Sequence, residues 1–379
     1  MAVTDNREWQ APGGIPAPPA GAVPPPGPAA APVAPPPPVG WTPPPRPGLI
    51  PLRPMTLGTI LGASFRVLRR NPRPTFGVAL LVQGVVVVVS LALVAGAEVL
   101  AFSRIASAAP GDAATIGAGS GALVLLSLAI PLLLTLGASA FLQGIIVLEV
   151  SRATLGEKQT LRRLFARGRG RFWALIGYTM LLALAALVAV GVVIGLIVLF
   201  ASTLGTAGIV LAVLAGIFGF LALIVLFAWL ATKLSFVPSA LMLERLGIRA
   251  AIARSWSLTS GYFWRTLGIQ LLVTVIVSVA QQVLTTPLSL VFSILIPLTD
   301  PNGQVGPTTV ILLGVFGLVI IVVGVVFGAI VAVITTSTTA LIYLDLRMRK
   351  EGLDLDLARF VEARQAGDSS LPDPYLPTT

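Results

Sequence analysis

The chain has 379 residues, of which 56% are hydrophobic and 11% are charged, and its mean hydropathy is +0.95. An ordinary soluble domain has about a quarter of its residues charged, so this composition excludes that class. The 25 Lys and Arg outnumber the 15 Asp and Glu, which gives a net charge of +10. These basic residues lie at the ends of apolar runs, which indicates membrane orientation and not nucleic-acid binding.

The chain contains no Cys and no His. The first absence excludes disulfides, thiolate nucleophiles and Cys-ligated metals, and the second removes the commonest general base and metal ligand. No phosphate-binding glycine loop and no zinc-hydrolase motif occurs in the sequence. We therefore expect a non-enzymatic protein with no catalytic residue, no cofactor and no metal site.

The N-terminal segment, residues 1–54, holds 19 of the 31 prolines. Such a segment cannot form a packed core, so we expect a disordered cytoplasmic tail with polyproline II character. Two interpretations stay open: a flexible tail without a ligand, or a docking tract for a protein partner.

Six long apolar runs follow the proline-rich segment, and each can cross a hydrocarbon layer of roughly 30 Å as a helix. We expect an all-α polytopic membrane protein whose six-helix domain spans residues 55–361, with 362–379 as a disordered C-terminal tail. The predicted spans are 75–101, 121–148, 172–200, 206–232, 266–296 and 308–343.

One pattern occurs three times, with a period of about 100 residues. An apolar run ends in Leu and an acid, at Glu149, Glu244 and Asp345, and a basic stretch follows. This pattern predicts three repeated helix pairs. The second run of each pair is very long: from Thr206 to Glu244 a continuous helix would measure nearly 60 Å, about twice the hydrocarbon thickness. We expect these helices to tilt, kink or project beyond the bilayer, with Pro238 as one kink.

Segments before the first span of each pair are basic and amphipathic. In residues 57–70, Leu57, Ile60 and Phe65 share one helix face, and Thr56 precedes it as an N-cap. Similar patterns occur at 160–173, 248–259 and 353–361. We expect cytoplasmic-face helices that lie in the plane of the interface.

Orientation follows from the basic residues, because Lys and Arg concentrate in cytoplasmic loops. One side of the predicted topology carries 24 of the 25, and the other side carries Arg104 alone. We expect a multi-pass protein of the cell membrane with both termini in the cytoplasm.

The candidate site residues are the three repeated acids, Glu149, Glu244 and Asp345. They could surround a pseudo-threefold axis, or each could pair locally, as the spacings Glu149–Arg152 and Asp345–Arg349 allow. Polar residues inside the spans have two interpretations, hydrogen bonds between helices or a transport pathway. They are Gln83, Gln143, Gln270, Gln281 and Gln282.

Two segments carry a family resemblance: residues 51–66, PLRPMTLGTILGASFR, and residues 343–354, YLDLRMRKEGLD. They resemble actinobacterial membrane proteins related to the membrane domain of glycerophosphoryl diester phosphodiesterase. In the two-part enzymes of that family, a separate barrel domain carries the chemistry and uses His, acids and a divalent metal. The resemblance therefore implies a stand-alone membrane domain without the catalytic barrel.

Two functions fit these patterns. The first is the organisation of lipid or protein partners at the cytoplasmic face, with the lipid bilayer, anionic lipids in particular, and a partner of the proline-rich tail as ligands, and no nucleic acid. The alternative is a transporter or channel for a small solute or lipid, suggested by the repeat and the mid-span glutamines.

Overall fold

The computed structural model describes residues 48–107, 109, 113–203, 205–299, 306–368 and 370–376. All regular elements in these ranges are helices, which confirms the predicted all-α class. In chain order they are α1 (Leu57–Arg70), the π-helix η1 (Arg73–Gly77), α2 (Val78–Ala106), α3 (Ala113–Thr154), α4 (Leu161–Gly168), α5 (Phe172–Thr203), α6 (Gly205–Leu234), α7 (Val237–Leu243), α8 (Ile248–Thr259), α9 (Phe263–Thr299), α10 (Pro307–Glu351) and α11 (Leu353–Gln365).

Within the described ranges, six helical segments are long and apolar enough to cross a membrane, as predicted. Within their most apolar windows, at most 17% of the residues are buried inside the protein, so most of this apolar surface is suited to contact lipid. The chain is built as a multi-pass membrane protein. The segments are Arg73–Ala106, Gly119–Thr154, Phe172–Thr203, Gly205–Leu243, Phe263–Leu295 and Thr309–Glu351.

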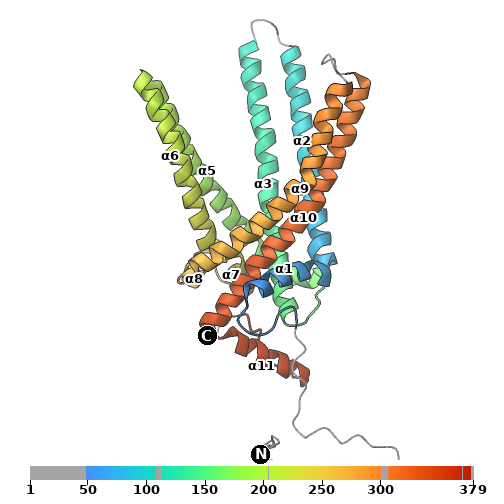
Figure 1. Cartoon of the computed structure of the whole chain (residues 1–379), viewed down its shortest axis with the longest axis vertical. Helices are drawn as coiled ribbons and strands as arrows, with labels where there is room; N and C mark the ends of the chain where they lie inside the picture. The colour runs from blue at the N-terminus through green and yellow to red at the C-terminus, as the bar shows by residue number, and fades with distance from the viewer. Residues whose placement is uncertain are drawn as a thin grey trace, which may run out of the picture. The chain divides into compact units, whose positions relative to one another are not determined.

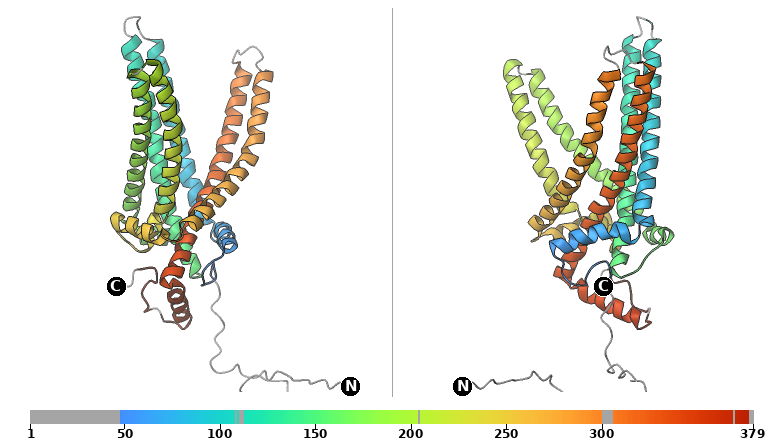
Figure 2. Two further views of the ribbon diagram at one scale, coloured as in Figure 1. Left: turned by 60° about the vertical axis from the view of Figure 1, so that its left-hand side comes forward. Right: turned by 45° about the vertical axis from the view of Figure 1, so that its right-hand side comes forward.

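The long helices pack in consecutive pairs, α2 with α3, α5 with α6 and α9 with α10. Helices α1, α7, α8 and α11 gather at one end of these pairs, as Figure 1 shows, and we call it the basic end. From that end, the α5–α6 pair and the α9–α10 pair diverge in every view of Figures 1 and 2.

The main hydrophobic core lies at the basic end and is built from the C-terminal parts of α3 and α10 together with α7. Consecutive residues are buried all round the helix at 145–150, 237–243 and 340–346. A helix that is apolar on every side is an interior helix, and here the neighbours are other protein elements and not lipid. The ring of Phe236 packs against that of Tyr343 inside this core, with centroids 6.1 Å apart.

The overlong second helices take two forms. Helix α6 ends at Leu234 and α7 begins at Val237 with Pro238 in its first turn, so the chain breaks next to the predicted kink. Helix α10 instead continues for 45 residues, about 68 Å at 1.5 Å per residue. It therefore extends well beyond one hydrocarbon thickness.

Helix α1 packs on α10 through Ile60, Ala63 and Val67. Its predicted N-cap is confirmed, since the Thr56 hydroxyl accepts a hydrogen bond from the Thr59 amide. Only part of its predicted apolar face is buried: Ile60 is buried, but Leu57 and Phe65 are exposed. The helix therefore presents apolar side chains both to the protein and away from it.

Both boundaries predicted for the membrane domain need correction. On the N-terminal side, Leu49 and Ile50 are buried, and the Leu49 amide donates to the Ala153 carbonyl at 2.8 Å. On the C-terminal side, residues 362–379 are not a wholly disordered tail, because α11 continues to Gln365 and Tyr375 is 1% exposed. The predicted disorder of residues 1–47 lies outside the described residues.

Helices α3, α5 and α7 approach one another closely at Gly144. A Cβ added there would lie 2.9 Å from the Phe172 ring and 3.1 Å from the Met242 methyl. Gly144→Ala is therefore expected to lower the free energy of unfolding by about 1–3 kcal/mol through overpacking. Denaturation of the purified protein in detergent measures this loss.

The matched control for this prediction is Gly137→Ala, on the same helix, where an added Cβ meets no atom within 4 Å. That variant should be as stable as the parent, or slightly more stable, because Ala favours helix over Gly by roughly 1 kcal/mol. Equal stability of the two variants would contradict the close packing at Gly144.

Candidate functional site

The three candidate acids are all buried at the basic end. Glu149 lies near the end of α3, Glu244 directly after α7, and Asp345 in the last third of α10. Their exposed fractions are 1%, 4% and 1%. A buried carboxylate needs a cation or several hydrogen bonds to offset its lost hydration, so the partners of each acid determine what it can do.

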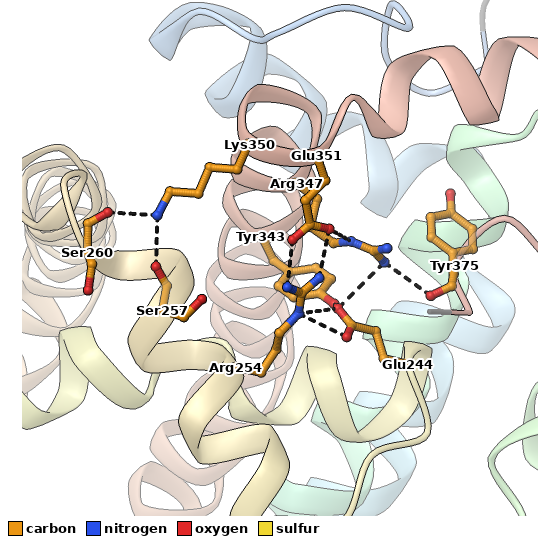
Figure 3. A network of polar contacts seen from close by, with 9 residues as sticks. All are labelled: Glu244, Arg254, Ser257, Ser260, Tyr343, Arg347, Lys350, Glu351 and Tyr375. Carbon is orange, nitrogen blue, oxygen red and sulfur yellow. Dashed lines mark hydrogen bonds and ion pairs between the residues drawn. The ribbon is translucent and has the colours of Figure 1, made fainter. Parts of the chain in front are cut away.

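Glu244 is the centre of a network that joins α8 to α10, drawn in Figure 3. The Arg254 Nε donates to both carboxylate oxygens, at 3.0 and 2.9 Å. The Arg347 guanidinium lies 3.6 Å from Oε1, and the Tyr343 hydroxyl donates to the same oxygen. Glu351 pairs with both arginines, at 2.6 and 3.0 Å, so two acids balance two bases.

Lys350 adds a second connection between the same two helices. Its ammonium group donates to the carbonyls of Ser257 and Ser260, at 2.8 and 2.7 Å, near the C-terminus of α8 (Figure 3). A cation there also favours the negative end of the helix dipole. Burial lowers the pKa of Arg254, but its bonds to Glu351 and Glu244 outweigh that effect and raise the pKa. Arg254 is therefore charged at every physiological pH.

Asp345 holds the segment before α1 in place. Its carboxylate accepts from the Met55 amide at 2.6 Å and pairs with Arg265 and Arg349, each at 3.0 Å. Both guanidinium groups also donate to the Met55 carbonyl, at 2.8 and 2.9 Å. One acid and two bases thus surround both backbone groups of a single residue.

Glu149 has the weakest partners of the three acids. Its Oε1 accepts from the Asn71 carboxamide at 2.8 Å, and Asn71 also donates to the Gln159 carbonyl at 2.9 Å. Its Oε2 is buried without a hydrogen-bond partner among the described residues. The side chain therefore bridges the α1–η1 junction and the loop after α3, with one oxygen unpaired.

In the described part of the chain each of the three acids has its own partners, since no residue pairs with or donates to more than one of them. Within the described ranges, no group of three acids is placed to hold a metal ion. Of the two local pairs, Asp345–Arg349 forms. Arg152 instead pairs with Asp373 near the C-terminus.

Tyr375, which packs against the C-terminal end of α3, was not predicted as a buried or functional residue. Its hydroxyl donates to the Ser151 carbonyl at 2.7 Å and contacts the Thr154 hydroxyl. Its own carbonyl accepts from Arg347 at 3.1 Å, which connects it to the Glu244 network. Burial raises the pKa of the phenol. Its aromatic ring, the only one in residues 366–379, was the available signal.

An apolar groove lies at the basic end of the molecule, beside the buried core, and we call it the interfacial groove. Its volume is about 610 Å³, and it lies between η1, the start of α2, α3 and α4. Two cations, Arg73 and Arg162, stand among otherwise uncharged walls. The lining residues are Arg73, Gly77, Val78, Leu81, Val82, Phe141, Leu161, Arg162 and Phe165.

A second concavity, the basic cleft, has a volume of about 640 Å³ and contains five cations and one acid. The acid, Glu157, pairs with Arg364 at 3.2 Å. Burial lowers the pKa of Arg167, and repulsion from Arg152 and Arg245 lowers it further. An anion in this cleft would relieve that repulsion. The lining residues are Glu157, Lys158, Gln159, Arg163, Ala166, Arg167, Arg245 and Arg364.

Glu244 and Glu149 allow a matched test of these environments. Glu244→Gln leaves Arg254 and Arg347 with only Glu351 as counter-ion, so the free energy of unfolding should fall by roughly 3 kcal/mol. Glu149→Gln keeps an acceptor for Asn71 and removes a buried charge, so its stability should be unchanged or higher. Thermal unfolding of both variants in detergent measures these two changes in stability. A larger loss in Glu149→Gln than in Glu244→Gln would contradict the partners assigned to the two acids.

Comparison with known proteins gives one match. No curated protein and no solved structure matches the chain. A family model described as "Domain of unknown function (DUF7847)" matches residues 55–346. That range begins at Met55, whose amide donates to Asp345, and ends at Leu346. It includes the three buried acids, five of the six apolar helical segments in full, and all but the last five residues of the sixth. Since the match covers most of the sequence, the chain belongs to the DUF7847 family.

Proposed function

We propose that the protein is a non-enzymatic integral protein of the cell membrane that binds anionic phospholipids at its basic end and so organises lipid or protein partners there. The interfacial groove carries this proposal. It combines apolar walls, suited to an acyl chain, with Arg73 and Arg162, suited to a phosphate.

The surface around the groove supports the same ligand. Helix α4 exposes Leu161 and Phe165 beside the exposed Arg162 and Arg163. Helix α1 likewise exposes Leu57 and Phe65, and it ends in Arg69 and Arg70. Apolar side chains next to cations are typical of helices in an interface with anionic lipid.

We also propose that the basic end of the protein faces the cytoplasm. With 24 of 25 Lys and Arg on one side of the predicted topology, the basic end lies in the cytoplasm together with both termini. In that topology the proline-rich residues 1–47 belong to the same side of the membrane, where they serve as a docking tract for a protein partner. Nucleic acid is not a ligand in this proposal, because the Lys and Arg residues set the membrane orientation and contact anionic lipid.

The two terminal segments of the membrane domain, residues 51–66 and 343–354, resemble the membrane domain of glycerophosphoryl diester phosphodiesterase. The chain would be such a membrane domain acting alone. The absence of His and Cys from the sequence supports a function without hydrolysis and without a cofactor. The second candidate, transport of a small solute or lipid, is favoured by one observation, a polar-lined cavity between α2, α3 and α10.

Removal of the two groove cations tests lipid binding. In nanodiscs of mixed phosphatidylglycerol and phosphatidylcholine, native mass spectrometry of the released protein should show retained phosphatidylglycerol. Each arginine near the interface adds about 1 kcal/mol, so the preference in Arg73→Gln/Arg162→Gln should fall by up to roughly 30-fold.

The matched control is Arg104→Gln, because Arg104 lies at the other end of α2. That variant should keep the preference of the parent. If the double variant retains phosphatidylglycerol as well as the parent does, or if the control loses it equally, anionic lipid binding in the groove is excluded.

A further inference from the structure

A cavity of about 560 Å³ lies among the membrane-spanning helices, apart from the interfacial groove. It is lined by α2, α3 and α10, with Thr179 from α5. None of the described residues that line it is charged, and seven of them carry a hydroxyl or carboxamide. The polar lining residues are Gln83, Thr135, Ser139, Gln143, Thr179, Thr335 and Thr336.

Three of these polar groups are unpaired. Within the described part of the chain, no hydrogen-bond partner exists for the side chains of Gln83, Gln143 and Thr336. The other hydroxyls donate to carbonyls of their own helices, as Thr179 does to Leu175 at 3.0 Å. An unpaired carboxamide in a hydrocarbon layer costs several kcal/mol, so these groups need a partner from outside the protein.

The predicted role of these glutamines in hydrogen bonding between helices is therefore not seen at Gln83 or Gln143. The packing of α2 against α10 instead leaves space for the Gln83 side chain. A Cβ added at Gly328 of α10 would lie 2.8 Å from the Gln83 Oε1. The glycine thus lets the carboxamide lie against the backbone of α10 at the edge of the cavity.

The three unpaired polar groups lie at comparable distances along their helices from charged residues at the basic end. Gln83 follows Arg73 by ten residues, about 15 Å along the helix. Gln143 and Thr336 precede the acids of their helices, Glu149 and Asp345, by six and nine residues, about 9 and 14 Å. All three therefore lie within about 15 Å, measured along their own helices, of a charged residue at the basic end.

We propose that this cavity binds the polar group of an uncharged lipid with hydroxyl and ester groups, of which diacylglycerol is the simplest. The carboxamides of Gln83 and Gln143 both donate and accept, which matches a hydroxyl beside an ester carbonyl. The uncharged lining disfavours a phosphate or an ion, because a buried charge would have no counter-ion.

The remaining walls explain why the ligand is a lipid and not a small solute. Val86 and Val87 of α2 face the cavity together with Ile321 and Val325 of α10. These side chains continue the apolar surface of spans that are little buried by the protein. An acyl chain can therefore follow this wall while the polar group occupies the glutamine end.

Photocrosslinking of the full-length protein in phosphatidylcholine nanodiscs tests the proposal, with a diacylglycerol that carries a diazirine next to the glycerol. Labelled peptides should map to α2, α3 and α10 near Gln83, Gln143 and Thr336. Gln83→Leu and Gln143→Leu should each reduce labelling roughly fivefold, the effect of one lost hydrogen bond. Monodisperse elution of the variants verifies that they fold.

The matched control is Gln270→Leu, since Gln270 is also a half-buried glutamine near the basic end of a span but does not line the cavity. This variant should label like the parent. Unlabelled diacylglycerol should compete, whereas phosphatidylglycerol and hexadecane should not. Equal labelling in all variants, or equal competition by hexadecane, would overturn the proposal, because binding would not depend on the polar groups.

Discussion

The structure depends on one constraint: the second helix of each pair contains more apolar residues than the bilayer can cover. Helix α10, at 45 residues, extends to about twice the hydrocarbon thickness. Apolar side chains beyond the bilayer would face water unless protein covers them. The projecting parts of α3 and α10, together with α7, therefore pack on one another and form the main core.

This core fixes the chemistry of the acids that it encloses. Glu244 pairs with Arg254 and Arg347, and Asp345 pairs with Arg265 and with an arginine of its own helix, which offsets the dehydration of both acids. These pairs connect α8, α9 and the segment before α1 to α10. The acids therefore serve to hold the short helices against the core, and the interfacial groove and the basic cleft lie beside the structure that they stabilise.

The sequence predicted the parts of this architecture that depend on local pattern. Apolar length predicts the six spans, and the i, i+4 spacing predicts the pair Asp345–Arg349. The long-range partners could not be predicted, because pairs such as Glu244–Arg347 join residues about 100 positions apart. For the same reason, the mid-span glutamines were recognisable as polar, but nothing local indicated that Gln83 and Gln143 share a cavity while Gln270 does not.

We expect the segments 141–153, 237–244 and 340–348 to form one cooperative unit at the basic end. Hydrogen–deuterium exchange of the protein in nanodiscs, at increasing denaturant, measures the stability of each segment separately. The three segments should lose protection together, at one denaturant concentration, after α4 and α11 have begun to exchange. Three separate transitions, or exchange of these segments as fast as that of α4, would contradict it.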